Sequence, residues 1–315
     1  MMNNPKLEAL VEEEYAHLSS ETLRHALKVQ SEILKAANDF LRGRGFTQIL
    51  PVIMSPVTDP LRHATGKAEV EYYEYRYQLT RSMILHKQMI LLAHDKIFAF
   101  SPNIRLEPVE LADTGRHLVE FTQLDLEVKE AKREEVMELG EDLVIHTFSE
   151  VKERCAAELK FFKREIRIPG KPFRRISYRE AYEQYGGGFE AVISQQHQEP
   201  VWIIDIPMEA REFYDREDAE RPGTLVDMDL LYPEGYGEAL SGGERENTYE
   251  RILGRIETSG LDTGAFQLYL EFAKRGLPRS AGFGIGMERM ARFVCGQKRI
   301  NDVVHFPKVP GRLSL

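Results

Sequence analysis

The sequence contains few of the residues and patterns that mark several common classes of protein. Only two of its 315 residues are cysteine, Cys155 and Cys295, which is too few for a disulfide framework and is typical of a reducing compartment. The nine histidines form neither an H-E-x-x-H pair nor a Cys/His zinc spacing. A P-loop and a G-x-S-x-G elbow are also missing. These absences argue against a zinc site, a P-loop nucleotide site and a serine hydrolase.

Long apolar runs and an excess of positive charge are missing as well. No apolar stretch approaches the ~20 residues that a membrane helix needs, and "MMNNPKLEALVEEEYAHL" lacks the basic start and apolar run of a signal peptide. We therefore expect a cytoplasmic protein with no membrane partner. The formal net charge is -9, which argues against nucleic acid as a partner, although a local basic patch is still compatible with it.

The residues that are present describe a globular chain with helices and paired strands. Hydrophobic residues make up 42% of the chain and charged residues 30%, enough for one large domain or two small ones. Strands that pair as hairpins between amphipathic helices predict an α+β fold with a largely antiparallel sheet. The expected helices are at 20–42, 84–94, 133–159 and 245–260, and the expected strands at 97–107, 119–128, 201–207, 224–232 and 238–243. A strand and a helix are expected at 282–296, a loop at 59–78 that enters a strand at "YQLT" (77–80), and an irregular, small insertion at 162–200.

The stretch "EFTQLDLEV", residues 120–128, has two chemically different faces. One face carries Leu124, Leu126 and neighbouring core residues, as in a strand that packs on a core. The other face carries Phe121, Gln123, Asp125 and Glu127, and the preceding strand ends in Arg105 and Glu107. Arginine and carboxylates on one face could hold a zwitterion, or a nucleotide with its metal, because the arginine fork binds phosphate oxygens in pairs. A solvated sheet face with cross-strand ion pairs is the alternative.

Two glycine-rich stretches add further charged residues. In "GFGIGMER" the glycines at 282, 284 and 286 do not match G-x-G-x-x-G, so a Rossmann site is excluded. A strand with so many glycines instead lets a ligand approach the backbone closely, and Arg289 follows this strand. In "GEALSGGEREN", Glu238 and Arg245 flank a bend, and Asp229 lies upstream. Carboxylates near phosphate-binding arginines suit magnesium. The alternative interpretation of "GFGIGMER" is tight packing of a strand on a helix, and that of "GEALSGGEREN" is a polar turn.

Together these stretches resemble the catalytic core of the class II aminoacyl-tRNA synthetases. "GFTQILPVIMSP" is similar to the first motif of that family, which builds a homodimer interface. "IRLE…RHLVEFTQLDLE" and "GFGIGMERM" are similar to its second and third motifs, in the form found in aspartyl- and asparaginyl-tRNA synthetases. The resemblance covers residues 20–315, and residues 1–19 are expected to form an N-terminal extension. It implies a class II synthetase-like domain with a largely antiparallel sheet.

The resemblance also suggests a particular activity. Aspartyl- and asparaginyl-tRNA synthetases carry an N-terminal anticodon-binding domain of roughly a hundred residues, for which this sequence leaves no room. The chain therefore looks most similar to the archaeal asparagine synthetases related to asparaginyl-tRNA synthetase. These make asparagine from aspartate, ATP and ammonia, and release AMP and pyrophosphate. The alternatives are a truncated paralogue that transfers the aminoacyl group to tRNA or a protein, and a regulatory paralogue without turnover.

The family motifs assign roles to particular residues of this sequence. Arg105 and Arg289 are the expected catalytic residues, and Asp229 and Glu238 the expected ligands of Mg²⁺. The residues expected to bind ATP are Arg105, Glu107, Arg116, His117, Leu118, Glu120, Phe121, Glu238, Ser241, Gly286 and Arg289. Those expected to bind aspartate are Ser82, Lys87, Gln123, Asp125 and Arg245. Lys87 and Arg245 match a pair that grips a carboxylate, and Asp125 matches a residue that holds the α-ammonium group.

One position departs from the family pattern. Ile84 stands where both relatives have a glutamine that helps to bind the amino acid, and an apolar side chain cannot replace that hydrogen bond. We therefore expect aspartate to bind in reverse, with its α-carboxylate at Lys87 and Arg245 and its β-carboxylate activated. Neither cysteine has the setting of a glutaminase nucleophile, so free ammonia is the expected nitrogen donor.

Overall fold

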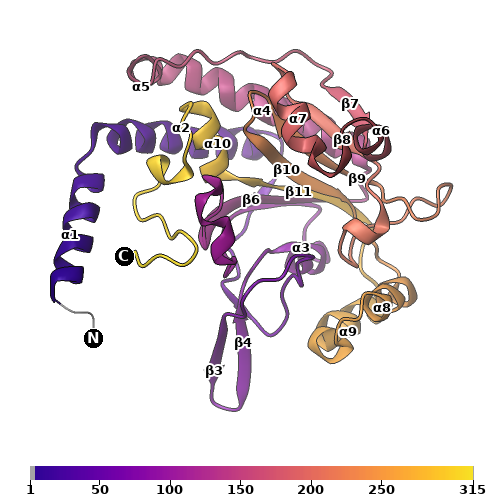
Figure 1. Cartoon of the computed structure of the whole chain (residues 1–315). Helices are drawn as coiled ribbons and strands as arrows, with labels where there is room; N and C mark the ends of the chain where they lie inside the picture. Colours follow the sequence, from indigo (N-terminus) through magenta and orange to yellow (C-terminus); the bar gives the residue numbers. More distant parts are fainter. Residues whose placement is uncertain (1–3, 315) are drawn as a thin grey trace.

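The centre of the molecule is an eight-stranded sheet. The computed structural model describes residues 4–314, and within them the strands are antiparallel except at the two edges, where β1 runs parallel to β5 and β7 parallel to β8 (Figure 1). The order across the sheet is β1 (Thr47–Gln48), β5 (Lys96–Ile104), β6 (Glu120–Lys129), β11 (Ser280–Gly286), β10 (Gly237–Glu244), β9 (Asp227–Tyr232), β8 (Val201–Ile204) and β7 (Arg174–Ser177).

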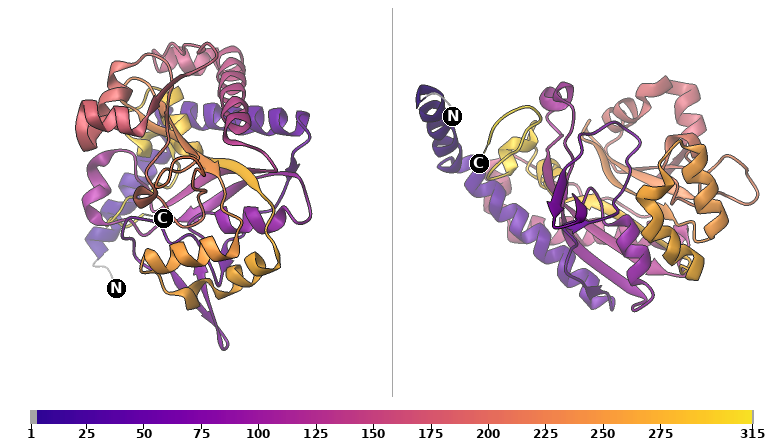
Figure 2. Two further views of the ribbon diagram at one scale, coloured as in Figure 1. Left: turned by 90° about the vertical axis from the view of Figure 1, so that its right-hand side faces the viewer. Right: turned by 90° about the horizontal axis from the view of Figure 1, so that it is seen from below.

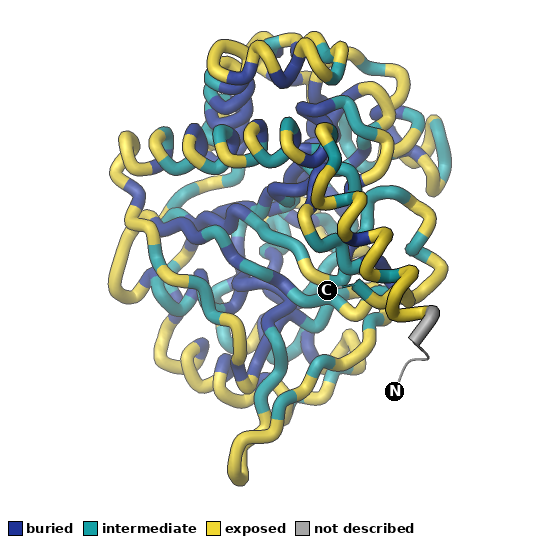
Figure 3. Tube along the Cα trace, turned by 90° about the vertical axis from the view of Figure 1, so that its left-hand side faces the viewer, coloured by how far each residue is buried: buried dark blue, intermediate teal, exposed yellow. Residues whose placement is uncertain are grey.

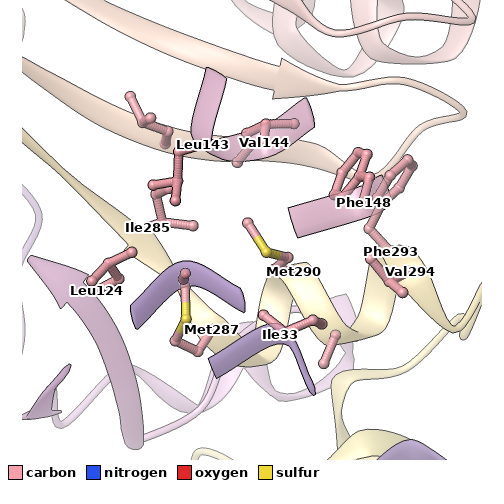
Figure 4. Close-up of a cluster of buried hydrophobic side chains, with 14 of the residues drawn as sticks. Ile33, Leu124, Leu143, Val144, Phe148, Ile285, Met287, Met290, Phe293 and Val294 are labelled. Atoms are coloured by element: carbon pink, nitrogen blue, oxygen red, sulfur yellow. The ribbon is translucent and has the colours of Figure 1, made fainter. Parts of the chain in front are cut away.

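Three helices cover one face of this sheet and form the main core with it. They are α2 (Glu21–Gly43), α4 (Arg133–Arg154) and α10 (Met287–Val294). Ile33, Phe148 and Met290 from these helices are almost fully buried against Leu124 and Ile285 of the sheet (Figure 4). Burying each such side chain contributes about 1.5–3 kcal/mol. The apolar stripe of α2 explains its position, since the buried residues recur at helical spacing and its outer side is exposed (Figure 3).

A second, smaller apolar cluster lies on the other side of the sheet. Here α3 (Ile84–Ile90), α8 (Tyr249–Thr258) and α9 (Gln267–Arg275) come together (Figure 2). Ile84, Phe213 and Tyr269 are buried in this cluster. The three-stranded sheet of β2 (Met54–Ser55), β4 (Tyr75–Leu79) and β3 (Glu69–Tyr72) projects from the same side (Figure 1).

Most of the predicted elements are confirmed, but three predictions are wrong. The segment 59–78 was expected to be a loop that enters a strand at Tyr77, yet it also holds β3, and β4 begins at Tyr75. The segment 162–200 is not irregular, because it supplies β7, α6 (Tyr178–Tyr185) and α7 (Phe189–Gln196). The helix expected at 133–159 is interrupted at Cys155 and continues as α5 (Ala156–Phe161). Pairing of β7 with β8 joins residues far apart in sequence, which local patterns do not indicate. The predicted N-terminal extension contains α1 (Asn4–Leu18).

The glycines of β11 make room for the polar side chains of β6. Gly282 lies opposite Glu127 and Gly284 opposite Asp125 across the ladder. A β-carbon at Gly282 would stand 2.3 Å from a carboxylate oxygen of Glu127 and 2.3 Å from the carbonyl oxygen of Leu126. Glycine is therefore required at 282 by the close approach of β6, both its backbone and the Glu127 carboxylate, rather than by a turn.

We predict that Gly282→Ala destabilises the protein by about 1–3 kcal/mol or more, since the new methyl group overpacks a site where backbone lies too close. Gly254→Ala is the matched control. Gly254 lies inside α8 with nothing within 4 Å of an added β-carbon, so alanine should stabilise by about 0.5–1 kcal/mol. Urea denaturation measures both, and equal midpoints for the two variants would contradict the packing argument.

Candidate active site

Two adjoining cavities contain nearly all of the residues that the sequence singled out. The larger cavity has a volume of about 260 Å³ and the smaller one of about 50 Å³. Arg105, Gln123 and Glu238 line both, so the two cavities adjoin at these three side chains. Of the other predicted residues, the larger cavity is lined by Ser82, Lys87, Asp125, Ser241 and Arg245, and the smaller one by Glu107, Arg116, His117, Leu118, Phe121, Gly286 and Arg289.

Lys87 reaches the floor of the larger cavity from α3. Its Nζ atom lies 2.9 Å from Asp125 Oδ1 and 3.5 Å from Glu127 Oε2, and its side chain is only 3% exposed. The same ammonium group donates hydrogen bonds to the carbonyl oxygens of Leu126 and Phe283, at 3.2 and 3.3 Å. Lys87 is thus held in place by two carboxylates and two carbonyl groups of the floor.

Arg245, which follows β10, is held by the same floor from the other side. Its Nε atom donates to Glu127 Oε1 at 3.1 Å, Nη1 donates to Asp215 Oδ1 at 2.9 Å, and Nη2 donates to the carbonyl oxygen of Gly282 at 2.9 Å. Although burial acts against the charge, Glu127 and Asp215 raise the pKa of Arg245. Lys87 and Arg245 therefore share one buried carboxylate, that of Glu127. A ligand carboxylate at Arg245 has to compete with Asp215 for Nη1.

The smaller cavity presents an aromatic ring and several cations. The Arg105 guanidinium lies 5.2 Å from the centre of the Phe121 ring, and its Nε atom donates to the carbonyl oxygen of Arg81 at 3.1 Å. Arg289 Nη1 lies 3.2 Å from Glu238 Oε1. Burial and the nearby Arg289 lower the pKa of His117 to about 4, so this histidine is neutral at pH 7. A flat ring beside arginines suits a nucleotide base with its phosphates.

Asp229 and Glu238 fit the predicted magnesium site in their chemistry. Asp229 lies on β9 and Glu238 on β10, two antiparallel neighbours. Asp229 Oδ1 is buried and accepts no hydrogen bond from the described part of the chain, while Oδ2 pairs with Arg211. Mg²⁺ is usually held by one or two carboxylates together with substrate phosphates. Residues 4–314 contain no group of three or more metal-ligating side chains, so phosphate oxygens would have to complete the shell.

Two predicted residues stand outside the cavities, and several lining residues were missed. Asp229 lines neither cavity. Glu120 also lines neither; on β6 it alternates with the cavity-lining Phe121 and Gln123, and its carboxylate pairs with Lys308 Nζ at 2.8 Å. The missed residues of the larger cavity are Asp59, Leu61, Arg62, His63, Ala210, Arg211, Glu212, Tyr214 and Asp215. The only local signal for them is "AREFYD", where charged residues surround two aromatic ones.

The fold and the paired cavities define a class of protein. A mostly antiparallel sheet flanked by helices, with polar side chains of β6 forming a cavity floor, is the catalytic core of a class II aminoacyl-tRNA synthetase. Residues 6–310 match the family model described as tRNA synthetases class II (D, K and N), and the chain belongs to this family. Its chemistry is the formation of an aminoacyl adenylate, and the family in general uses ATP and Mg²⁺.

Solved structures of synthetases share this architecture. Asparaginyl-tRNA synthetase from Pyrococcus horikoshii, complexed with asparaginyl-adenylate, is 28% identical with a TM-score of 0.87, and the match covers 98% of this chain and 75% of that one. Aspartyl-tRNA synthetase from Entamoeba histolytica is 26% identical with a TM-score of 0.76, covering 95% of this chain and 61% of that one. Because these relatives are tRNA synthetases, the argument from net charge against a nucleic acid partner is not supported.

No helix within residues 4–314 has the length and apolarity to cross a membrane.

We predict that Glu127→Gln destabilises the protein by about 3 kcal/mol, because it removes the negative charge that two buried cations share. Glu120→Gln is the matched control on the same strand. Glu120 is 46% exposed and pairs only with Lys308 at the surface, so its loss should cost less than about 1 kcal/mol. The free energy of unfolding in urea measures both. Similar values for the two variants would show that Lys87 and Arg245 do not depend on Glu127.

Proposed function

We propose that this chain makes asparagine from aspartate, ATP and ammonia through a β-aspartyl adenylate, and releases AMP and pyrophosphate. The observation that carries the proposal is the lining of the larger cavity. It combines two buried cations, Lys87 and Arg245, with carboxylates on several sides. Such a lining suits a small molecule with both carboxylate and ammonium groups, and aspartate is the smallest such acidic amino acid.

In this proposal ATP occupies the smaller cavity. Its adenine stacks on Phe121, and Arg105 binds the α-phosphate where the two cavities meet. Arg105 and Arg289 stabilise the negative charge that develops as pyrophosphate leaves. Asp229 and Glu238 would hold Mg²⁺, which neutralises charge on the phosphate oxygens when it is bound. Because His117 is neutral, it can donate a hydrogen bond to the phosphates without placing a further positive charge beside the arginines.

Aspartate is proposed to bind with its α-carboxylate at Lys87 and Arg245 and its β-carboxylate toward Arg105. The support is Ile84, which lines the larger cavity, is 4% exposed and offers no hydrogen bond from its side chain. Ser82 lies beside it, and its Oγ atom accepts a hydrogen bond from the Ile84 backbone at 3.2 Å. The α-ammonium group therefore has fewer partners on this side of the cavity, which favours the reversed orientation.

Ammonia is proposed to come from solution. Burial raises the pKa of Cys155 to about 11 and that of Cys295 to about 12, so neither thiol forms the thiolate that a glutaminase needs.

The chain is further proposed to be a cytoplasmic homodimer. Between β1 and β2, in the segment similar to the first family motif, Leu50 is 90% exposed and Ile53 is 54% exposed. Such exposed apolar residues suit an interface with a second copy.

Transfer of the aminoacyl group to tRNA is the second candidate function. Its support is the likeness to the P. horikoshii asparaginyl-tRNA synthetase over 98% of this chain. A regulatory protein without turnover is the weaker alternative, because binding of an amino acid alone does not need Arg289 and the two acidic residues proposed for magnesium.

We predict that the purified protein forms asparagine and AMP when it is incubated with aspartate, MgATP and ammonium. Amino-acid analysis and AMP detection measure the products, and parallel reactions contain tRNA in place of ammonium. Folded protein that forms neither product would reject the proposal. Aminoacyl-tRNA with little free asparagine would favour the second candidate.

Arg289→Ala should lower the rate by about 10²–10³ by removing transition-state charge stabilisation.

The carboxylate that is activated can be identified with hydroxylamine. We predict that hydroxylamine traps the adenylate as β-aspartyl hydroxamate, because the α-carboxylate is held at Lys87 and Arg245, away from Arg105. Chromatography against both hydroxamate standards separates the products. α-Aspartyl hydroxamate as the main product would contradict the reversed orientation, while leaving adenylate formation itself intact.

A further inference from the structure

The two buried cations of the larger cavity come from segments that an uncharged contact also joins. We call Lys87, on α3, and Arg245, which follows β10, the carboxylate clamp. The residues that come directly after them, Gln88 and Glu246, contact each other: Gln88 Nε2 donates to the backbone carbonyl oxygen of Glu246 at 3.1 Å. One hydrogen bond therefore joins the two segments at positions next to both cations.

Gln88 is fully buried, and both ends of its amide group are used. Its exposed fraction is 0%, as is that of Tyr269 on α9. The carbonyl oxygen of Glu246 can only accept a hydrogen bond, so the NH₂ end of the amide faces Glu246 and the Oε1 end faces Tyr269. The Tyr269 hydroxyl donates to Oε1 at 2.6 Å. Hydrogen bonds thus run from Tyr269 through Gln88 to Glu246 and fix the Gln88 side chain in one orientation.

The surroundings of Gln88 give no packing reason for a polar side chain. Tyr269 belongs to the smaller apolar cluster with Ile84 and Phe213, and its ring centre lies 5.9 Å from that of Phe213. A buried amide is costly unless it is hydrogen-bonded, and methionine would fill a similar volume without that cost. Gln88 also lines neither cavity, so direct contact with a ligand is not its purpose.

Glu246 is a fixed point to which a short helix can be attached. Its backbone N–H donates to the carbonyl oxygen of Tyr214 at 2.8 Å. Its Oε1 atom accepts from the backbone N–H groups of Asn247 and Thr248, at 3.0 Å each. In contrast, α3 has only seven residues, and so short a helix depends on tertiary contacts. The bond from Gln88 therefore places α3 relative to a segment that is already held.

The charged contacts of the clamp do not determine its geometry by themselves. Both cations pair with Glu127, but Lys87 also pairs with Asp125 and Arg245 with Asp215, each at 2.9 Å. The ammonium group of a lysine is a point charge on a flexible stem, so it can pair with either carboxylate. Successive helical residues point about 100° apart, so the contact of residue 88 holds α3 from a different side than the cavity floor does.

We propose that Gln88 is a positioning residue of the carboxylate clamp, with Tyr269 as its anchor, and that together they fix the separation of Lys87 and Arg245. This role rests on the proposed function, which places the α-carboxylate of aspartate at these two cations. Binding groups have to be held within roughly 0.5 Å of their productive geometry. Without the bond from Gln88, α3 can shift relative to Glu246, and Lys87 shifts with it.

The test compares Gln88→Met and Tyr269→Phe with wild type in steady-state asparagine synthesis. Gln88→Met keeps the volume and loses both hydrogen bonds, so we expect the KM for aspartate to rise about ten-fold and the KM for ATP to stay unchanged. Tyr269→Phe keeps the bond between Gln88 and Glu246, so the KM for aspartate should rise less. General destabilisation would instead reduce the amount of folded enzyme, which lowers the apparent kcat and leaves both KM values unchanged.

Ile256→Val is the matched control for a purely structural effect. Ile256 is fully buried in the same apolar cluster, so the variant should lower the midpoint of urea unfolding and leave both KM values unchanged. If the KM for aspartate in Gln88→Met equals that of Ile256→Val, the positioning role is overturned. Should Gln88→Met fail to fold, Tyr269→Phe decides in its place, and an unchanged KM for aspartate in that variant overturns the role.

A binding measurement separates this role from the proposed function. The Tm of wild type should rise with aspartate or asparagine, and Gln88→Met should need about ten-fold more of the same amino acid for the same rise. Wild type that binds in this way without making asparagine would reject the proposed function and keep the role of Gln88. Equal concentration dependence in Gln88→Met and wild type, or a wild type that responds to neither amino acid, would overturn that role.

Discussion

The carboxylate of Glu127, fully buried between Lys87 and Arg245, is the interaction on which the site depends. It ties β6 to α3 on one side and to the end of β10 on the other. Lys87 and Arg245 each have one further carboxylate partner, Asp125 and Asp215, whereas Glu127 without the two cations would be a buried unpaired charge. The ion pairs therefore hold the carboxylate-binding groups in one geometry before any ligand arrives. In the proposed function, stability and ligand recognition would rest here on the same three side chains.

This arrangement is possible because the side chains of β6 and β11 alternate between the two faces of the sheet. On one face, Leu126 lies opposite Phe283, and both are buried in the main core. On the other face, Gly282 lies opposite Glu127 and leaves the space that its carboxylate fills. A single pair of strands thus separates an apolar core from a charged floor. A shift of register by one residue would put charges into the core, so the core also determines which side chains reach the cavities.

The local pattern of the sequence predicted β6 and its two faces, but it left open whether the polar face was solvated or lined a site. The structure places Phe121, Gln123 and Asp125 of that face at the cavities. The motif residues Arg105, Phe121 and Arg289 also lie at the cavities, as the family resemblance implied. What could not be predicted depends on contacts between distant segments. Arg245 and Glu127 are 118 positions apart, so nothing local shows that the two cations of the carboxylate clamp share one anion. Asp59 and Glu212 line one cavity for the same kind of reason, and the pairing of Glu120 with Lys308 also joins two segments far apart in the chain.

Asp215 links the two halves of the larger cavity. It pairs with Arg245 of the carboxylate clamp and lines the same cavity as Asp59 and Glu212. A substrate carboxylate that takes Nη1 of Arg245 would release Asp215, which would then add its charge to Asp59 and Glu212. The cavity would then attract a positively charged group of the ligand more strongly once the clamp is filled. Binding of the carboxylate and binding of the positively charged group would therefore favour each other by the same free energy, as linkage requires. In the proposed reaction this coupling would hold both charged ends of aspartate in the cavity.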